Sequence, residues 1–262
     1  LSMNPNDLTK KISKKTRGII VTHIAGFPNP DLKEIQEICQ KNSLFLIEDA
    51  THAMGATINN RKVGTFGDAA VFAFTPTKVL TTGEGGMLVT DDSDLANYAR
   101  LYSYYGSGPG KTNFENLGRH MMMPEISAIL GIYQLKRLEE FIAKRNQIAS
   151  IYDRAFDQMG YFSTVKCSSG SRSSYYKYPL ILDPKIDKAA FVKSLNNSAI
   201  ETGSVFYPPC HMQPVYLKQK VKGLPLPIAE ETLARTITLP LHLALSNLDV
   251  SYVVKNVQLA LA

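Results

Sequence analysis

Short runs of apolar, β-branched residues alternate along the first half of the chain with helix-like segments. The strand-like runs cover residues 19–23, 44–50, 69–74 and 86–90. After the first run, apolar residues recur at helical spacing from residue 32 to residue 38, which predicts a helix. Apolar strands interleaved with helices predict an α/β fold with a mainly parallel sheet that is covered on both faces.

A longer helical pattern follows over residues 124–158. Its apolar residues lie along one side of the predicted helix: Ile126, Ile129, Leu130, Tyr133, Leu135, Leu138, Phe141 and Ile142. Such a stripe is typical either of a helix in the core of one chain or of a contact between two subunits, and we keep both interpretations.

The second half of the chain has its own set of elements. A serine-rich loop, a strand, a helix and a final helix are predicted at residues 168–174, at 176–182, near 188–196 and up to Ala262. We therefore expect a domain boundary near residue 160. The first domain, residues 1–160, ends in the long helix, and the second, residues 161–262, is smaller.

Composition and charge narrow the class of protein. The 262 residues are 44% hydrophobic and 20% charged, which is typical of a globular chain. No apolar stretch approaches the roughly 18 residues of a membrane-spanning helix, and the first residues lack an export signal. The net charge of +6 favours anionic ligands, but no basic stripe with interleaved aromatic residues indicates nucleic-acid binding.

Cys39, Cys167 and Cys210 are odd in number and widely spaced, without a Cys-x-x-Cys pair. This spacing favours thiols in a reducing cytoplasm over a disulfide framework, and it predicts no metal site. The chain also begins without methionine, so we expect that it starts partway into a longer protein.

A glycine-rich segment at residues 106–112 is similar to a phosphate-binding P-loop. A P-loop needs a glycine five residues before its Gly-Lys pair, where this chain has Tyr105. It also leaves a strand and opens a helix, whereas residues 95–105 have the pattern of a helix. We therefore interpret the segment as a surface loop.

Three polar residues follow predicted strands. Asp49 ends the second strand, His52 comes three residues later, and Lys78 lies on the turn that leaves the third strand. Singly, they have ordinary interpretations as a helix cap, a core histidine and a surface lysine. At the carboxyl ends of strands, where ligands collect in α/β sheets, an acid can keep a pyridine nitrogen protonated and a lysine can bind an aldehyde. Pyridoxal 5′-phosphate (PLP) offers both groups.

At these residues the chain resembles the DegT-like sugar-nucleotide aminotransferases, a branch of the fold-type I PLP enzymes. The matching segments run in order along the chain: VTH with Gly26 at 21–26, IEDATHAMGA at 47–56, GTFGD at 64–68, FAFTPTK at 72–78, GEGGM at 83–87, MPEI at 123–126, YPPCHMQP at 207–214 and LPLH at 239–242. Each segment alone is a weak match, and the resemblance is specific because all of them occur in this order. The resemblance implies the aspartate aminotransferase-like fold, with a three-layer large domain and a smaller C-terminal α+β domain.

The resemblance also implies roles for single residues. Lys78 stands where the family has its Schiff-base lysine, and Asp49 where it has the acid that pairs with the pyridinium nitrogen. His52 takes the place of a Gln or His near the phenolic oxygen of the cofactor. His211 lies in a loop that approaches the sugar nucleotide in some members. His120 lies in a segment that reaches the neighbouring subunit's site, so we expect both histidines to bind substrate in a homodimer.

The implied activity is PLP-dependent transfer of an amino group. The expected donor is an amino acid, glutamate, and the acceptor is a keto-sugar linked to a nucleotide diphosphate. Lys78 moves the proton between the α-carbon of the donor and the C4′ carbon of the cofactor. The expected partners are these two small molecules and a second copy of the chain, with no nucleic acid and no membrane.

The chain departs from the family pattern at several places. It lacks the N-terminal portion that contributes phosphate contacts and an aromatic residue over the ring. Ala73 stands where members have a phosphate-binding serine, His120 where they have Asn or Lys, and Met122 where they have Arg or Asn. These departures support an alternative, a non-catalytic or truncated homologue with an assembly or regulatory role, whereas the intact Asp49 and Lys78 pair supports the enzyme.

Overall fold

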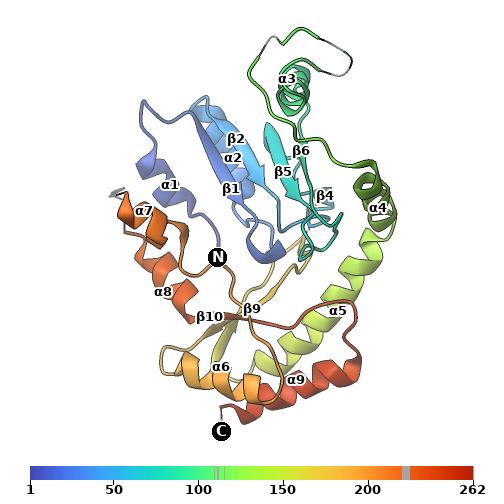
Figure 1. The fold of residues 1–262 in the computed structure, drawn as a ribbon. Helices are drawn as coiled ribbons and strands as arrows, with labels where there is room; N and C mark the ends of the chain where they lie inside the picture. Colours follow the sequence, from blue (N-terminus) through green and yellow to red (C-terminus); the bar gives the residue numbers. More distant parts are fainter. Residues whose placement is uncertain (109, 111, 115, 220–224, 262) are drawn as a thin grey trace. The chain divides into compact units, whose positions relative to one another are not determined.

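The computed structural model describes residues 1–108, 110, 112–114, 116–219 and 225–261, and the chain forms two compact units (Figure 1). The N-terminal unit consists of Ser2–Glu140 and Ser168–Ser174; the C-terminal unit consists of Leu1, Phe141–Cys167 and Tyr175–Ala262. These units are defined by contacts within each. The domain boundary that the sequence places near residue 160 stays a prediction.

A four-stranded sheet lies at the centre of the N-terminal unit. Its strands are β1 (Gly18–Thr22), β2 (Phe45–Asp49), β5 (Ala69–Ala73) and β6 (Gly86–Val89), in the order β1-β2-β5-β6. Each begins and ends within one residue of its predicted run. β1, β2 and β5 are parallel, whereas β6 pairs antiparallel with β5. The carboxyl ends of β2 and β5 therefore lie at the same edge of the sheet.

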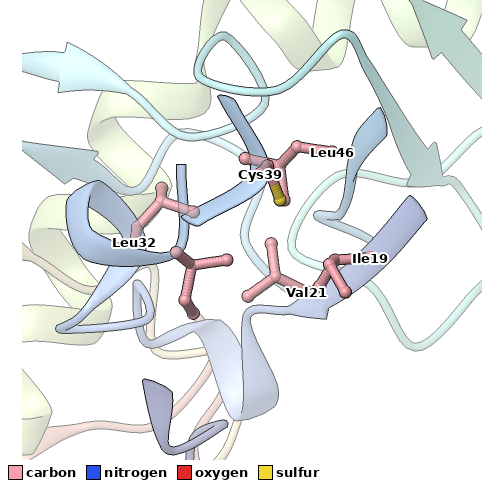
Figure 2. Packing of buried hydrophobic residues seen from close by; sticks show 6 residues of the cluster. Ile19, Val21, Leu32, Cys39 and Leu46 are labelled. Atoms are coloured by element: carbon pink, nitrogen blue, oxygen red, sulfur yellow. The ribbon is translucent and has the colours of Figure 1, made fainter. Parts of the chain in front are cut away.

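Helix α2 (Leu32–Lys41) covers one face of this sheet. Apolar side chains at helical spacing on α2 pack against alternate residues of β1 and β2 (Figure 2). The buried cluster consists of Leu32, Ile35, Cys39, Ile19, Val21 and Leu46. Burial of side chains of this size stabilises the fold by roughly 1.5–3 kcal/mol each, so this cluster anchors the β1-α2-β2 part of the unit.

The opposite face of β1 and β2 is open in the described part of the chain. Ile20 is 62% exposed and Phe45 is 66% exposed. Because side chains alternate between faces along a strand, Asp49 lies on the same face as Phe45. The α/β fold with a mainly parallel sheet is confirmed, with α2 covering one face and Asp49 placed on the other.

Shorter elements complete the N-terminal unit: α1 (Pro5–Lys11), η1 (Ile24–Gly26), α3 (Ser93–Ser103), α4 (Glu125–Lys136) and a small antiparallel sheet of β4 (Arg61–Lys62), β3 (Thr57–Ile58) and β8 (Ser171–Arg172). β8 lies inside the serine-rich segment that the sequence predicts as a loop. This segment comes back to the N-terminal unit from far along the chain and pairs with β3.

The helix predicted over residues 124–158 is two helices. α4 ends with Arg137 as its C-cap, and α5 (Leu138–Phe156) begins directly afterwards. The apolar residues of α5 are buried, including Phe141 and Ile142, whereas those of α4 are exposed: Ile126 83%, Ile129 53%, Leu130 42%, Tyr133 64% and Leu135 56%. The core interpretation therefore holds for α5 and not for α4 within a single chain.

The C-terminal unit is built on an antiparallel sheet in the order β10-β9-β7. Its strands are β7 (Phe162–Thr164), β9 (Tyr178–Leu182) and β10 (Thr236–Leu239), and its further helices are α6 (Lys188–Asn197), η2 (Cys210–Met212), α7 (Pro214–Lys218), α8 (Pro227–Arg235) and α9 (Asn247–Leu259). Aromatic rings form much of its core: the Tyr152 ring lies 4.9 Å from that of Tyr178 and 5.8 Å from that of Phe156. The unit is an α+β domain.

The described residues contain neither a membrane-spanning helix nor a cluster of metal-binding side chains. None of their helices has the length and apolar character needed to cross a membrane. No group of three or more His, Cys, Asp and Glu side chains among them is arranged to hold a metal ion. Cys39, Cys167 and Cys210 are thiols rather than disulfides.

Candidate active site

Asp49 and Lys78 follow two neighbouring parallel strands. Asp49 is the last residue of β2 and pairs with Val71 of β5, and the N–H of Ala50 donates to the carbonyl of Val71 at 3.0 Å. Lys78 lies on the turn that leaves β5. Because β2 and β5 are parallel, both residues lie at the carboxyl edge of the sheet, where α/β folds bind ligands.

The Asp49 carboxylate is anchored through one of its oxygens. Oδ1 accepts hydrogen bonds from the Thr51 hydroxyl at 2.7 Å and from the Thr51 N–H at 3.2 Å. Among the described residues, no group donates to Oδ2. The carboxylate is thus held in place on the open face of the sheet, with one oxygen left to accept a hydrogen bond from a ligand.

The turn that carries Lys78 is closed by hydrogen bonds at its base. The carbonyl of Phe74 accepts from the Thr82 N–H and from the Thr81 hydroxyl, each at 3.0 Å, and the Phe74 N–H donates to the Gly85 carbonyl at 2.9 Å. Gly85 has a φ of +149°, and a Cβ there would lie 2.7 Å from Thr82 Oγ1. A glycine is therefore needed where the turn rejoins the sheet, and the backbone of Lys78 stays next to the end of β5.

His52 is buried, and groups from two distant segments hydrogen-bond it. Its Nδ1 accepts from the Ala25 N–H at 3.3 Å, and its carbonyl accepts from the Ser174 hydroxyl at 3.0 Å. The Ser174 N–H and the Ser173 hydroxyl both donate to the Gly26 carbonyl, at 3.0 and 2.8 Å. The η1 turn and the returning segment 173–174 thus hold His52 three residues after Asp49.

A buried carboxylate directly precedes the last residue of β2. Glu48 accepts from His23 Nε2 at 3.0 Å and from the N–H groups of Gly64, Gly67 and Phe66 at 2.8, 2.8 and 2.6 Å. Burial alone would raise the pKa of Glu48, but the hydrogen bonds from His23, Gly64 and Gly67 together hold that pKa below its usual value. Glu48 is therefore a buried anion that ties β1, β2 and residues 64–67 together.

The sequence alone does not predict that this region also contains Glu48, His23 and Ser174. A signal exists for Glu48, because a carboxylate inside an apolar run must find donors if it is buried. No comparable signal shows that its partner is a histidine 25 residues away. Ser174 lies in a segment whose composition indicates only a loop.

His120 lies elsewhere in the N-terminal unit. It forms a β-bridge with Tyr104 after α3, and its ring stacks on that of Tyr105 at 5.1 Å. Because β6 runs antiparallel, α3 begins at the edge of the sheet opposite to Lys78 (Figure 1). The N-terminal unit thus carries Asp49, His52 and Lys78 on the segments that follow β2 and β5, and His120 on the segment that follows α3.

His211 belongs to the C-terminal unit, where its Nε2 lies 2.8 Å from Glu230 Oε1. This hydrogen bond is the main cause that holds the pKa of Glu230 below its usual value. The glycine-rich segment 106–112 follows α3 rather than a strand, and its residues Pro109 and Lys111 lie outside the described residues.

The residues at this edge fit the ring and the aldehyde of PLP. Asp49 offers one carboxylate oxygen to a pyridinium N–H, and Lys78 is an amine at the same edge. Ala73 is two residues beyond Val71, the partner of Asp49, so its methyl group lies on the same face as that carboxylate. A methyl group cannot hydrogen-bond a phosphate, so the fit is poorer at the phosphate than at the ring.

Comparison with known proteins identifies the relatives of the chain. Residues 1–258 match the model of the DegT/DnrJ/EryC1/StrS aminotransferase family. The chain is 33% identical over 273 residues to the spore coat polysaccharide biosynthesis protein SpsC of Bacillus subtilis, covering 98% of this chain and 70% of SpsC. It is also 33% identical over 258 residues to the GDP-perosamine synthase of Escherichia coli O157:H7, covering 97% and 68%.

A solved structure gives the same result for the fold. The chain is similar to Helicobacter pylori PseC, an aminotransferase involved in the biosynthesis of pseudoaminic acid, with a TM-score of 0.92 and 29% identity over 99% of this chain and 70% of PseC. The resemblance seen in the sequence and the fold that it implies are thereby confirmed. The chain belongs to the DegT/DnrJ/EryC1/StrS family of PLP-dependent aminotransferases.

Proposed function

We propose that the protein transfers an amino group from glutamate to a keto-sugar linked to a nucleotide diphosphate. The observation that carries this proposal is the placement of Asp49 and Lys78 at the ends of adjacent parallel strands. The name of the E. coli relative, GDP-perosamine synthase, supports a nucleotide-linked sugar. The net charge of +6 is compatible with such an anionic substrate.

The chain's own residues divide the work of this reaction. When bound, PLP supplies an electron-accepting ring and an aldehyde that carries the amino group. Asp49 would accept a hydrogen bond from the ring nitrogen, and its negative charge would keep that nitrogen protonated. Lys78 would hold the aldehyde through Nζ and, as an amine, would remove and return the proton at the substrate carbon. His52 would lie near the phenolic oxygen.

This function is tested in two half-reactions. The PLP-loaded protein is first mixed with L-glutamate alone, and release of one 2-oxoglutarate per site with loss of the visible cofactor absorbance is expected. Nucleotide-linked keto-sugars are then added, and one of them should restore the absorbance and gain an amine by mass spectrometry. Reaction with another amino acid but not with glutamate would contradict the donor. No reaction with any amino acid would favour the non-catalytic alternative.

Ala73→Ser is expected to tighten PLP binding by roughly 10- to 100-fold. The added hydroxyl would donate to the charged phosphate, and a hydrogen bond of this kind contributes about 1.5–3 kcal/mol. Fluorescence titration of the apoprotein with PLP measures the change. Ala73→Val, which adds volume without a donor, is the control, and equal affinities for the serine variant and the unchanged protein would contradict the missing phosphate contact.

We also propose a homodimer in which a second copy covers α4. α4 is rich in large apolar residues, yet Ile126 is 83% exposed and Tyr133 is 64% exposed. Helices of this composition are normally buried, and large exposed apolar surfaces mark interaction sites. The predicted role of His120 in a neighbouring subunit's site also needs a second copy.

Ile129→Asp is expected to weaken this dimer at least about 100-fold. Ile129 is 53% exposed in the single chain, so the charge leaves the fold of the monomer intact but must be desolvated in the interface. Sedimentation velocity over a concentration series measures the dissociation constant. The matched control is Leu248→Asp on α9, where the side chain is 83% exposed. An unchanged dissociation constant for Ile129→Asp, or a monomeric unmodified protein, would contradict the proposed interface.

A cytoplasmic location is also proposed. Cys39, Cys167 and Cys210 are thiols in the structure. Burial, with a smaller contribution from Asp68, raises the pKa of the Cys39 thiol above its usual value and keeps it protonated. Protein thiols persist in reducing compartments, which supports this location.

A further inference from the structure

Most of the net positive charge of the chain is concentrated in one short stretch. Five of the 29 Lys and Arg residues, but only one of the 23 Asp and Glu residues, lie among positions 1–17. These positions carry a net charge of +4 out of +6, and the rest of the chain carries only +2. The five cations are Lys10, Lys11, Lys14, Lys15 and Arg17. We call residues 10–17 the basic segment.

The first two lysines of the basic segment end helix α1. Leu8 of this helix packs against the buried cluster between α2 and the sheet, which fixes how the helix lies. Lys10 and Lys11 are in its last turn, and both are exposed. Asp7 lies 3.9 Å from Lys11, and among the described residues it is the only acid that forms an ion pair with the basic segment. A single pair between exposed side chains leaves most of the positive charge unpaired.

The rest of the basic segment is a closed turn with its cations at the surface. The Thr16 N–H donates to the Ser13 carbonyl at 3.0 Å, and the Ser13 N–H donates to the Thr16 hydroxyl at 3.0 Å. Lys14 and Lys15 lie between these two residues, and Arg17 follows directly. All three cations are exposed. The turn therefore presents a fixed group of positive charges to solvent.

The basic segment lies at the edge of the sheet opposite to the candidate active site. Arg17 directly precedes β1, whereas Asp49 pairs with Thr22 at the other end of that strand. Figure 1 shows the connection from α1 arriving at the amino end of β1. The five residues from Arg17 to Thr22 span about 16 Å of extended chain. Because salt screens charges beyond a Debye length of about 8 Å, the basic segment adds little to the attraction of a substrate near Asp49.

The composition of the basic segment indicates which other anionic partner it fits. Four of its five cations are lysines, which are depleted in protein–protein interfaces. It contains no aromatic residue that could stack on a nucleic-acid base. Its large apolar residue, Ile12, is half-buried and thus is not a free anchor for a protein partner. Exposed clusters of lysine and arginine without further features are typical of segments that bind anionic lipid headgroups.

Acidic residues limit the positive patch along the same edge of the sheet. Because β6 is antiparallel, Asp91, Asp92 and Asp94 follow it at the edge where β1 begins. β6 is three strands away from β1, which is about 14 Å at the usual strand spacing. An anionic surface would therefore be contacted by the β1 side of this edge and not by its whole length.

We propose that the basic segment binds the protein reversibly to an anionic membrane surface. The lysines contact the headgroups by charge alone, and no part of the chain enters the hydrocarbon. This proposal departs from the expectation of no membrane partner, which follows from the lack of a spanning segment. It does not rest on the proposed function. In this arrangement the edge of the sheet that carries Asp49 and Lys78 faces away from the membrane.

Co-sedimentation of the 262-residue chain with vesicles measures this binding without cofactor or substrate. Vesicles of phosphatidylcholine with about 40% phosphatidylglycerol are compared with vesicles of phosphatidylcholine alone, at about 50 and 300 mM salt. We expect binding to the vesicles that contain phosphatidylglycerol and not to the others. We also expect the binding to weaken strongly at the higher salt concentration, because it is electrostatic.

The double variant Lys14→Gln/Lys15→Gln is expected to lower the vesicle partition coefficient by about 25-fold. Each lysine close to an anionic membrane accounts for about fivefold in binding. The matched control is Lys193→Gln/Lys255→Gln, which removes the same charge from exposed positions on α6 and α9. This control should bind within about threefold of the unmodified protein, because the attraction decays within a Debye length of the surface.

Four results would overturn the proposal. Absence of binding to the phosphatidylglycerol vesicles at low salt, or equal losses in the two double variants, would make the basic segment an ordinary solvated surface. Release of the bound protein by excess glycerol 3-phosphate would show that a single phosphate is recognised. Tighter binding to a DNA duplex that Lys14→Gln/Lys15→Gln weakens would assign a nucleic-acid partner instead. Amino transfer is measured separately, so its absence counts against the proposed function and not against membrane binding.

Discussion

Lys78→Ala is expected to lower the rate of amino transfer by roughly 10²–10⁴-fold, the range found when a general acid–base group is removed. The change also removes the amine that holds the cofactor aldehyde, so the visible absorbance of lysine-bound PLP should disappear from the loaded protein. Stopped-flow absorbance with glutamate measures the first half-reaction, and a spectrum of the loaded variant measures the second effect.

The control for this prediction is Lys62→Ala. Lys62 lies on β4 and its Nζ is 3.1 Å from Glu139 Oε1, with both side chains exposed. This variant should keep both the rate and the visible absorbance. A Lys78→Ala protein that reacts with glutamate at the unmodified rate would exclude Lys78 as the reactive amine and direct attention to another lysine.

Glu48→Gln is expected to lower the free energy of unfolding by about 2–4 kcal/mol. An amide of the same shape accepts through one oxygen only, and its NH₂ group must face N–H donors that now point at the Glu48 carboxylate. Breaking a fully buried, hydrogen-bonded anion leaves these donors without an acceptor. Urea denaturation followed by circular dichroism measures the loss.

Glu139→Gln is the matched control for Glu48→Gln. The Glu139 carboxylate contacts Lys62 and Arg172, but its side chain is 60% exposed. Ion pairs at such positions contribute about 1 kcal/mol or less, so this variant should unfold near the urea concentration of the unmodified protein. Equal losses for the two glutamine variants would show that the Glu48 contacts add nothing beyond an ordinary surface pair.

The Glu48 prediction also has a defined pH dependence. The pKa of Glu48 is lowered in the folded protein, so the folded state favours the ionised carboxylate more than the unfolded state does. The stabilisation is complete above the unfolded-state value of about 4.3 and is lost as the pH falls through the lower folded-state value. The difference in stability between the unmodified protein and Glu48→Gln should therefore narrow on acidification below about pH 4.

Much of the N-terminal unit follows from local patterns. The runs at 19–23 and 44–50 are apolar and β-branched because Val21 and Leu46 are buried under α2, and the helix at Leu32 has its apolar residues on the side that covers them. These properties belong to short segments, so the sequence predicts them closely. Asp49 and Lys78 are predictable for the same reason, since each follows a strand directly.

Other features depend on contacts between distant segments. The apolar residues of α4 indicate that another surface covers this helix, but periodicity does not show whether that surface belongs to the same chain or to another one. Ser173 and Ser174 have the composition of a loop and become buried only because they meet Gly26. The pairing of Glu48 with His23 and the left-handed turn at Ala25 likewise arise from the folded arrangement.

Borohydride reduction of the PLP-loaded protein followed by peptide mass mapping tests most directly whether Lys78 holds the cofactor. Reduction makes the link between PLP and a lysine permanent, so the modified residue can be identified. A single PLP adduct on the peptide that contains Lys78 is the predicted result. An adduct on a different lysine, or none at all in the loaded protein, would contradict the assignment of Lys78.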